Sequence, residues 1–373
     1  MRGLYIHVPL CVSRCRYCDF YKVTPKQWPG GERYLVALEQ ELALLPEGFV
    51  PQTIFIGGGT PSALAPEELR QLMQLLQSSV DVSQVMEWSV EVNPNSLERE
   101  KLLALLEGGV NRLSMGVQTF QAEALALLGR AHTTEVAVAA YHLAREVGFE
   151  KINIDMIQSV PGLTAAQRAG DVEQLLSLAP EHISYYNLIY EPGTPLTRDR
   201  DAGKLDLLSD DEEATIYEDI AHRLGSAGYE QYEISNFAKP GEQCLHNLIY
   251  WKGGEYIGCG PSAHSHWQGE RFSNRADLES YCSRLAAGES IVEMRERLAP
   301  AAKAREILVM WLRLGCGVDR QEFRQVTGVE LAALYNEEWE SLIEEKLLEW
   351  DGTVLRIPAE KRFVSNAVCS VLV

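Results

Sequence analysis

The sequence is poor in positive charge. Its 34 lysine and arginine residues stand against 53 aspartate and glutamate residues, so the formal net charge is −19 at pH 7. A field of this sign repels nucleic acids and anionic membrane surfaces, and neither is expected as the main partner. The chain also lacks an apolar run of about 18 residues, the length that a membrane-spanning helix needs. We therefore expect no transmembrane segment.

We expect no secretory leader either, because only Arg2 precedes an apolar stretch that His7 interrupts. This absence disfavours the disulfide-rich secreted classes and favours a cytoplasmic location. A composition of 46% hydrophobic and 23% charged residues excludes a disordered chain. The length of 373 residues suffices for one large domain and a smaller one.

Three of the eight cysteines are concentrated near the N-terminus. Cys11, Cys15 and Cys18 have the spacing C-x3-C-x2-C, and the alternating residues 3–9 before them predict a strand that ends at Pro9. Three thiolates in one loop suit an iron–sulfur cluster, and a cubane would then keep one iron open to a substrate or cofactor. Zinc and a disulfide are the alternatives, although no fourth cysteine or histidine follows at zinc-finger spacing.

Beyond the cysteines, short apolar runs alternate with stretches of helical periodicity. Further strands are predicted at 53–56, 88–93, 112–117, 151–156 and 182–188, and helices at 31–45, 66–76, 97–106, 122–128, 134–147, 165–178 and 210–227. Six strand–helix units imply a parallel sheet that curls into most of a (β/α) barrel. Functional groups of such barrels lie at the carboxyl ends of the strands. The cysteines, a glycine run at 57–59, Glu91, Gln118 and Asp155 all fall there.

The rest of the chain has another pattern. Strands are expected at 229–234 and 256–257, then helices at 301–314, 320–327 and 331–346, and a hairpin at the Asp-Gly pair 351–352. Helices followed by a hairpin indicate a winged-helix-like module, and the acidic charge favours protein contact over DNA binding. The expected architecture is α/β, with three parts: a partial (β/α)6 barrel at 1–227, a mixed α+β extension at 228–295, and a C-terminal helical, winged-helix-like module at 296–373.

The cysteine spacing after a first barrel strand resembles the signature of the radical S-adenosylmethionine (SAM) family. The flanking residues, YIHVP at 5–9 and Asp19-Phe20, are similar to those of oxygen-independent coproporphyrinogen oxidases and their HemW-type relatives. The similarity runs over nearly the whole chain. It implies a radical-SAM barrel in which Cys11, Cys15 and Cys18 hold a [4Fe-4S] cluster and SAM binds at the open iron.

The same resemblance implies which residues surround SAM. The glycine run resembles the family loop that holds the amino and carboxylate groups of SAM, since glycines let a ligand approach the backbone, but alone it is as often only a turn. A hydrogen bond to ribose is implied for Glu91, which otherwise reads as a surface glutamate. The residues implied to lie near SAM are Tyr5, Tyr17, Gly58, Gly59, Thr60, Glu91, Gln118, Arg130 and Asp155. Without the resemblance, the two tyrosines would be interpreted as aromatic residues packed in the core. The other polar residues would be interpreted as ordinary residues at the ends of secondary-structure elements.

A second distinctive segment follows the barrel. It is similar to the H-N-x-x-Y-W motif of HemW-type proteins and is formed by His246, Asn247, Tyr250 and Trp251. A neutral imidazole can ligate haem iron, and aromatic residues can cover a porphyrin face. A lone histidine before an aromatic pair is otherwise more often a core residue. Cys244 and Cys259 are alternative thiolate ligands, although buried thiols are usually inert.

Two features separate the chain from the oxidases that it resembles. Those enzymes carry C-x3-C-x2-C-x-C, whereas here the fourth position is Phe20, and their N-terminal arm is longer than the ten residues before Cys11. The resemblance therefore implies a haem chaperone that binds the cluster, SAM and haem, and passes haem to an acceptor protein.

The alternative is an enzyme, an oxygen-independent coproporphyrinogen III dehydrogenase. There an electron donor reduces the cluster, and cleavage of SAM yields a 5′-deoxyadenosyl radical that abstracts hydrogen from a propionate. Phe20, the short arm and the His246 motif discriminate between the two, and no catalytic residue is assigned. A third class, an iron–sulfur electron carrier, leaves the SAM-like positions unexplained.

Overall fold

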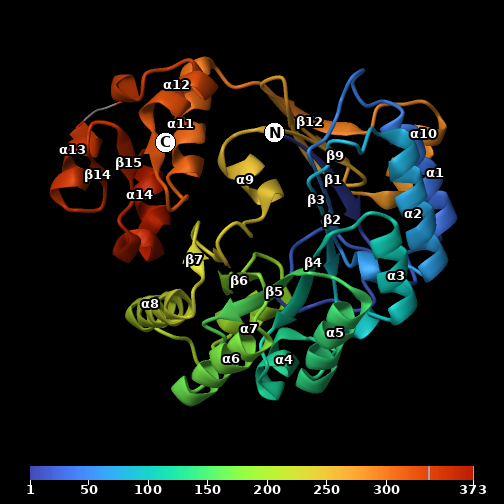
Figure 1. The fold of residues 1–373 in the computed structure, drawn as a ribbon, viewed down its shortest axis with the longest axis horizontal. Coiled ribbons are helices and arrows are strands. Elements are labelled where there is room, and N and C mark those ends of the chain that lie inside the picture. The colour runs from blue at the N-terminus through green and yellow to red at the C-terminus, as the bar shows by residue number, and fades with distance from the viewer. Residues whose placement is uncertain (335–336, 373) are drawn as a thin grey trace.

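A twelve-stranded sheet organises the larger part of the chain in a computed structural model that describes residues 1–334 and 337–372 (Figure 1). Its order is β12-β11-β10-β9-β1-β2-β3-β4-β5-β6-β8-β7. The central strands run parallel to one another and are β1 (Arg2–Val8), β2 (Thr53–Gly58), β3 (Glu87–Val92), β4 (Arg112–Gln118), β5 (Lys151–Gln158) and β6 (His182–Asn187). The predicted six-stranded parallel barrel core is thus confirmed.

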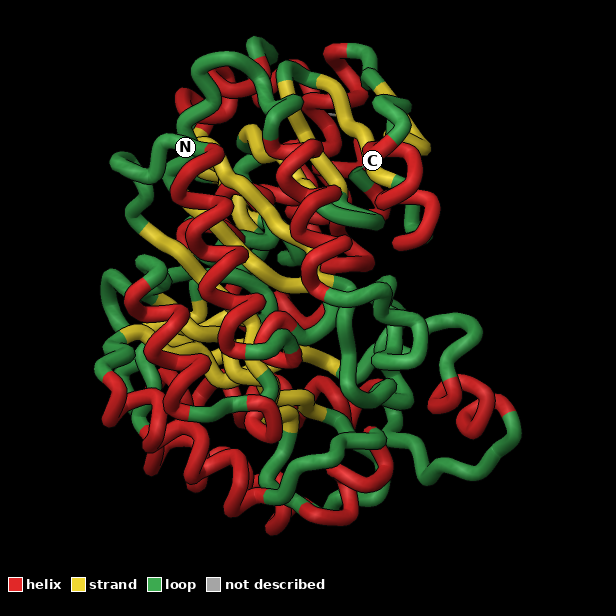
Figure 2. Tube along the Cα trace, turned by 90° about the vertical axis from the view of Figure 1, so that its right-hand side faces the viewer, coloured by secondary structure: helices red, strands yellow, loops and turns green. Residues whose placement is uncertain are grey.

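Helices cover the outside of this curved sheet, as the two views in Figures 1 and 2 show. The crossover helices are α1 (Gly31–Leu42), α2 (Pro66–Ser79), α3 (Arg99–Glu107), α4 (Ala122–Leu128), α5 (Thr134–Val147), α6 (Ala165–Leu178), α7 (Pro195–Asp201) and α8 (Asp210–Ser226). In α2, Leu69, Leu72, Met73 and Leu76 are buried at the spacing of one helix face. A capping box of Ser209 and Glu212 starts α8.

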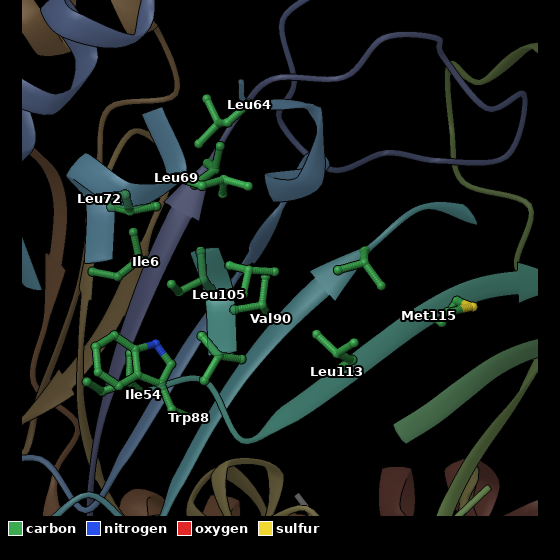
Figure 3. Packing of buried hydrophobic residues seen from close by; sticks show 14 of the residues in the cluster. Ile6, Ile54, Leu64, Leu69, Leu72, Trp88, Val90, Leu105, Leu113 and Met115 are labelled. Atoms are coloured by element: carbon green, nitrogen blue, oxygen red, sulfur yellow. The ribbon is translucent and has the colours of Figure 1, made fainter. Parts of the chain in front are cut away.

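The side chains of the parallel strands alternate between two environments. Those that point outward are apolar and buried beneath the helices, as Figure 3 shows for Ile6, Ile54, Val90, Leu113 and Met115. Each such side chain stabilises the fold by roughly 2 kcal/mol. The residues between them face the inside of the curve. Successive side chains of a strand point to opposite faces of the sheet, so a shift of one residue would expose the apolar side chains. Burial of the outer face therefore fixes the strand register, and the inner face can carry polar groups.

Residues 228–295 extend both ends of the sheet. On one side, β9 (Glu255–Cys259) pairs with β1 in parallel and continues into the antiparallel strands β10 (His264–Trp267), β11 (Glu270–Asn274) and β12 (Val292–Glu296). On the other side, β6 pairs with β8 (Asn236–Ala238), which pairs with β7 (Glu230–Gln231). Between them in sequence, α9 (Leu245–Trp251) lies near the N-terminus and contacts β1, β2 and β9 (Figure 1).

The C-terminal part has a core of its own, built around Trp311, Phe323 and Leu355. Its helices are α11 (Pro300–Trp311), α12 (Arg320–Thr327), α13 (Glu337–Glu344) and α14 (Ser365–Val371), and its small sheet has the order β13 (Val318–Asp319), β15 (Val354–Arg356), β14 (Glu349–Trp350).

Helix α10 (Leu278–Ala286) packs on α1. Short 3-10 turns lie at Pro61–Ala63, Pro94–Ser96, Leu331–Leu334 and Ala359–Val364. In the described part of the chain, no helix combines the length and apolarity that crossing a bilayer would require.

The differences from the sequence expectations lie mainly after the barrel. The strand predicted at 229–234 is regular only at Glu230–Gln231. Beyond it, Glu233 forms an isolated bridge with Leu314, and its carboxylate accepts a hydrogen bond from the Ser235 amide. The helix predicted at 331–346 is a 3-10 turn followed by α13, and residues 335–336 lie outside the described part. Helices α7, α9, α10 and α14 were not expected.

A buried carboxylate ties α1 to the added strands. Glu41 accepts hydrogen bonds from the Gly260 amide at 2.7 Å, Asn274 Nδ2 at 2.6 Å and the Tyr281 hydroxyl at 2.6 Å. Burial raises the pKa of Glu41 to about 7, against these three donors, which favour the charged form. Protonation of Glu41 is therefore coupled to folding.

This coupling predicts a pH dependence of stability. The folded-state pKa lies above the unfolded value, so the stabilising contribution of protonated Glu41 is complete below about pH 4.5 and is lost as pH rises through about 7. The unfolding free energy of the wild type minus that of Glu41→Gln should therefore fall by roughly 2–3 kcal/mol as pH rises over that window. Denaturant unfolding at a series of pH values measures it, and a difference that grows with pH would contradict the assignment.

Candidate functional site

The inside of the curved sheet encloses one large cavity of ≈ 740 Å³. This volume lies in the upper part of the range for small-molecule sites. Fifteen of the sixteen candidate residues from the sequence line it, namely Cys11, Cys15, Cys18, Tyr5, Tyr17, Gly58, Gly59, Thr60, Glu91, Gln118, Arg130, Asp155, His246, Asn247 and Tyr250. The exception is Trp251. Segments more than 200 residues apart in sequence therefore meet at one site.

The cysteine loop is held from both sides of the cavity mouth. The backbone amide of Cys11 donates to Val23 at 2.9 Å, and that of Arg16 donates to Leu128 at the end of α4 at 2.9 Å. The Arg16 guanidinium forms an ion pair with Asp199 of α7. These contacts fix a loop that has no regular secondary structure of its own, so the positions of the thiols are set before any ligand binds.

Each of the three thiols has a polar neighbour. Thr60 Oγ1 lies 3.5 Å from Cys11 Sγ, Arg130 donates to Cys15 Sγ at 3.3 Å, and Lys22 Nζ donates to Cys18 Sγ at 3.3 Å. All eight cysteines of the chain are free thiols. The side chains of Arg130 and Lys22 place positive charge beside two of these sulfurs, and can offset the negative charge of thiolates bound to metal. The donor set therefore fits an iron–sulfur cluster.

The geometry differs from that of a single-ion site. Within residues 1–334 and 337–372, no three His, Cys, Asp or Glu side chains converge as ligands of one metal ion do. A structural zinc site needs such convergence, whereas the thiolates of a cubane each bind a different iron. The other two cysteines considered as ligands are packed inside: burial raises the pKa of Cys244 to about 12 and also raises that of Cys259.

The glycine run forms the wall beside the cysteines. Gly58 has φ +102°, and its amide donates to Glu91 Oε2 at 3.0 Å, while the Thr60 amide donates to Leu10 at 2.7 Å. A Cβ at Gly58 would lie 2.4 Å from the His7 ring, and one at Gly59 would lie 2.7 Å from the backbone of Leu10. The demand for glycine here arises from the protein itself as well as from any ligand.

We expect Gly58→Val to lower the unfolding free energy of the metal-free protein by at least about 3 kcal/mol, because overlap with His7 adds to the cost of a positive φ. Gly162→Val is the matched control. Its φ is +82°, but nothing lies within 4 Å of an added Cβ, so the expected loss is about 1–2 kcal/mol. Equal losses in the two variants by denaturant unfolding would show that the loop tolerates side chains.

Two carboxylates, those of Glu91 and Asp155, line the cavity and influence each other through their charges. Burial raises the pKa of Glu91 to about 7, and the neighbouring Asp155 adds to this rise. Burial also raises the pKa of Asp155, although Asn153 and Ser114 hydrogen-bond to it. Donors on a ligand, such as ribose hydroxyls or an ammonium group, would relieve this repulsion. The pair is therefore suited to a ligand rich in donors.

Several polar residues that line the cavity are buried, and one of them has a strained backbone conformation. Gln118 ends β4 with φ 75°, a conformation that non-glycine residues seldom adopt. Arg130 donates to the Gly116 carbonyl, and its buried Nε has no partner in the described part of the chain. Burial raises the pKa of both Tyr5 and Tyr17, so both hydroxyls stay protonated and can donate. Strain and unmet donors of this kind cluster at ligand sites.

His246 lies at the other end of the cavity, on α9. Its ring is fully buried, stacks on Phe55 with centroids 5.3 Å apart, and engages both nitrogens: Nδ1 with Thr53 Oγ1 at 2.7 Å and Nε2 with the Tyr250 hydroxyl at 2.7 Å. Burial, assisted by the Arg112 charge, lowers the pKa of His246 to about 3. The ring is therefore neutral, as a metal ligand must be, but Nε2 is occupied by Tyr250.

Trp251 points elsewhere. Its ring packs against the C-terminal core, and the Arg313 guanidinium lies 5.7 Å from the ring centroid. It thus connects α9 to the C-terminal module and does not reach the cavity.

The sequence reasoning missed the residue that holds α9. Glu87, at the start of β3, accepts hydrogen bonds from the backbone amides of Leu245 at 2.9 Å and His246 at 3.0 Å, and from Cys244 Sγ at 3.4 Å. It serves as the N-cap that Cys244 cannot provide. The only sequence signal is a charged residue at the start of a strand, and the same signal marks Arg112 on β4.

Comparison with known proteins agrees with this geometry. Residues 5–175 match the radical SAM superfamily, and residues 298–364 match the HemN C-terminal domain. The chain is 36% identical to the heme chaperone HemW of Bacillus subtilis over 99% of its own length and 98% of that protein. It is 38% identical to the heme chaperone HemW of Escherichia coli over 70% of its own length and 69% of that protein.

Among solved structures, coproporphyrinogen III oxidase (HemN) from Escherichia coli, a radical SAM enzyme, superposes with a TM-score of 0.86 at 26% identity, covering 100% of this chain and 89% of HemN. The chain therefore shares the fold of this enzyme. Identity over the full length separates the HemW relatives from this enzyme, and the chain belongs to the HemW family of the radical SAM superfamily.

Proposed function

We propose that this protein is a haem chaperone that holds a [4Fe-4S] cluster and SAM, binds haem in the same cavity and passes it to an acceptor protein. The observation that carries the proposal is the shared cavity. The cysteine loop and most of the SAM-like positions line one end, and His246, Asn247 and Tyr250 line the other. Tyr5 stacks on Phe55 near the His246 end. The name of the HemW relatives supports haem as the cargo.

Cys11, Cys15 and Cys18 would hold the cluster, and membership of the radical SAM superfamily supports both cluster and SAM. When bound, the cluster supplies an open iron position and a one-electron reservoir. The residues around it have separate tasks. Lys22 and Arg130 would offset the negative charge of the thiolates, and the missing side chains of Gly58 and Gly59 would let the amino-acid part of SAM approach the backbone.

The cavity mouth is suited to a flat apolar cargo. Phe20, Val12 and Ile189 line it and are 72%, 66% and 64% exposed, although large apolar side chains are usually buried. Apolar side chains at a mouth can cover the faces of a macrocycle as it enters or leaves. The same rim is where an acceptor protein would approach, and the acidic surface favours a protein over nucleic acid.

The second candidate is coproporphyrinogen III dehydrogenation, with an electron donor if SAM is cleaved. The likeness to HemN over the whole chain favours it. Against it stands Phe20, which occupies the position of the fourth cysteine in the oxidases and is exposed at the mouth. The residues around the cavity thus keep the cofactor apparatus but replace the oxidase cysteine with an apolar rim. We propose that the protein acts in the cytoplasm.

Parallel assays test the proposal. Anaerobically reconstituted protein should bind haem in a one-to-one ratio, seen as a saturating change in the haem absorption spectrum, and should leave coproporphyrinogen III unchanged when SAM and a reductant are supplied. Turnover of coproporphyrinogen without saturable haem binding would replace the chaperone by the enzyme.

A further inference from the structure

The cavity wall contains a buried arginine without a partner. Arg112 begins β4 and lines the cavity, yet only 4% of the residue is exposed. Its guanidinium forms no hydrogen bond or ion pair with residues 1–334 or 337–372, and acts on its neighbours only through its charge. Five N–H donors and a full charge without an acceptor are costly inside a protein. The side chain is therefore arranged for an acceptor that enters the cavity.

The strand register places Arg112 at the His246 end of the cavity. It pairs with Ser89 on β3, which pairs with Phe55 on β2, and the Phe55 ring stacks on His246. Side chains at the same level of parallel strands face the same layer of the interior. Asn247, the residue after His246, lines the same space. The glycine run lies at the opposite ends of the strands, beyond Ile56 of β2.

Nearby carboxylates already have donors of their own. The two oxygens of Glu87 accept from the α9 amides and Cys244, and Asp155 accepts from Asn153 at 2.6 Å and from Ser114. Both acids influence Arg112 electrostatically, but neither comes within ion-pair distance of it. An anion that enters the cavity would supply the acceptor that these carboxylates do not.

We infer that Arg112 binds a propionate carboxylate of haem, with the macrocycle lying over His246 and Phe55. This inference rests on the proposed function, and adds which group of the cargo meets which residue. A planar guanidinium matches a carboxylate through two parallel hydrogen bonds, and haem carries its carboxylates on the edge of a flat apolar ring. An iron ligand and a carboxylate receptor at one end of the cavity would orient the ring uniquely.

The carboxylate of SAM is a second source of the same chemistry. The family loop expected to hold it is the glycine run, at the far end of the strands from Arg112. If Arg112 only neutralised Glu87 and Asp155, haem binding would not depend on the carboxylates of the ligand.

The test compares haem with haem dimethyl ester, which lacks the free carboxylates, on reconstituted wild type and Arg112→Met. Methionine keeps the length of the side chain and removes the charge. The wild type should prefer haem over its ester by about 10- to 30-fold in Kd, and Arg112→Met should lose most of this preference. Arg112→Lys, which keeps the charge without the planar fork, should be intermediate. Iron content and melting temperature of each variant show whether the fold and cluster persist.

Arg271→Met is the control. Arg271 pairs with Glu296 and Glu306 outside the cavity, and its loss should leave the preference intact. If the wild type binds neither porphyrin, the proposed function fails and the inference with it. If it binds both equally, or if Arg112→Met keeps the preference, only the inference fails. A fall in SAM affinity with the haem preference retained would assign Arg112 to SAM and overturn the propionate role.

Discussion

Replacement of Cys15 by alanine should remove the iron–sulfur cluster completely, from about four irons per chain in the reconstituted wild type to almost none. Cys15 lies in the middle of the three-cysteine loop, and Arg130 donates to its sulfur. Two thiolates would leave two irons of a cubane without protein ligands. The loop itself should persist, because its anchors are backbone bonds from Cys11 and Arg16 that do not involve the Cys15 side chain.

The measurement is iron analysis with the visible absorption spectrum after anaerobic reconstitution. Cys316→Ala is the matched control, since Cys316 is an exposed thiol in the C-terminal part and should leave iron content unchanged. Melting temperatures of the metal-free proteins should be alike. A Cys15→Ala protein that keeps stoichiometric iron, or a wild type that takes up zinc and no iron, would refute the cluster assignment.

The second large effect is expected at His246 and Tyr250, and the two substitutions should act in opposite directions. His246→Ala removes the proposed axial ligand, so the haem spectrum should shift and the affinity should fall on the order of 100-fold, with the remainder supplied by burial of the ring faces. Tyr250→Phe should strengthen haem binding about fivefold, because the hydroxyl that occupies Nε2 at 2.7 Å no longer competes with the iron.

The double variant separates ligation from packing. If Tyr250 acts through the His246 nitrogen, Tyr250→Phe should have no effect on haem affinity once His246 is alanine. Haem titrations of the four proteins give this cycle directly. A Tyr250→Phe variant that binds haem more weakly in both backgrounds would mean that the hydroxyl contacts the cargo itself, and that His246 is a structural residue held by Thr53.

The barrel could be predicted from the sequence because its signals are local. Apolar residues with a period of two in the strands, and of three to four in helices such as α2, imply the alternating order, and the order implies parallel strands with aligned carboxyl ends. That rule alone predicted that Glu91, Gln118 and Asp155 would lie near the cysteine loop, and the structure brings all of them to one cavity. Their roles toward SAM remain predictions.

The far end of the cavity could not be predicted, since it depends on contacts between distant segments. Helix α9 has seven residues and no capping side chain of its own. It is specified by Glu87, which lies 158 residues before Leu245 in sequence. The orientation of Trp251, away from the cavity and toward the C-terminal core, depends equally on tertiary packing. Arg112 looked like the polar start of a strand, and only the register shows that it faces inward.

The pairing of His246 with Tyr250 also changes how haem binding is understood. Sequence similarity treats the motif residues as a set of ligands and ring-covering groups. In the structure they form a closed arrangement, with Thr53 and Tyr250 on the two nitrogens of His246 and Glu87 holding the helix. Haem ligation then requires a local change in α9, and Tyr250 is the group that must move.

Anomalous diffraction at the iron edge, from crystals of reconstituted protein grown anaerobically with haem, is the most direct test of the central claim that one cavity holds both groups. The account predicts a strong iron signal beside Cys11, Cys15 and Cys18, and a separate single-iron peak beside Nε2 of His246 at the other end of the same cavity. A haem iron located outside the cavity, or at the cysteine end with His246 still bonded to Tyr250, would contradict it.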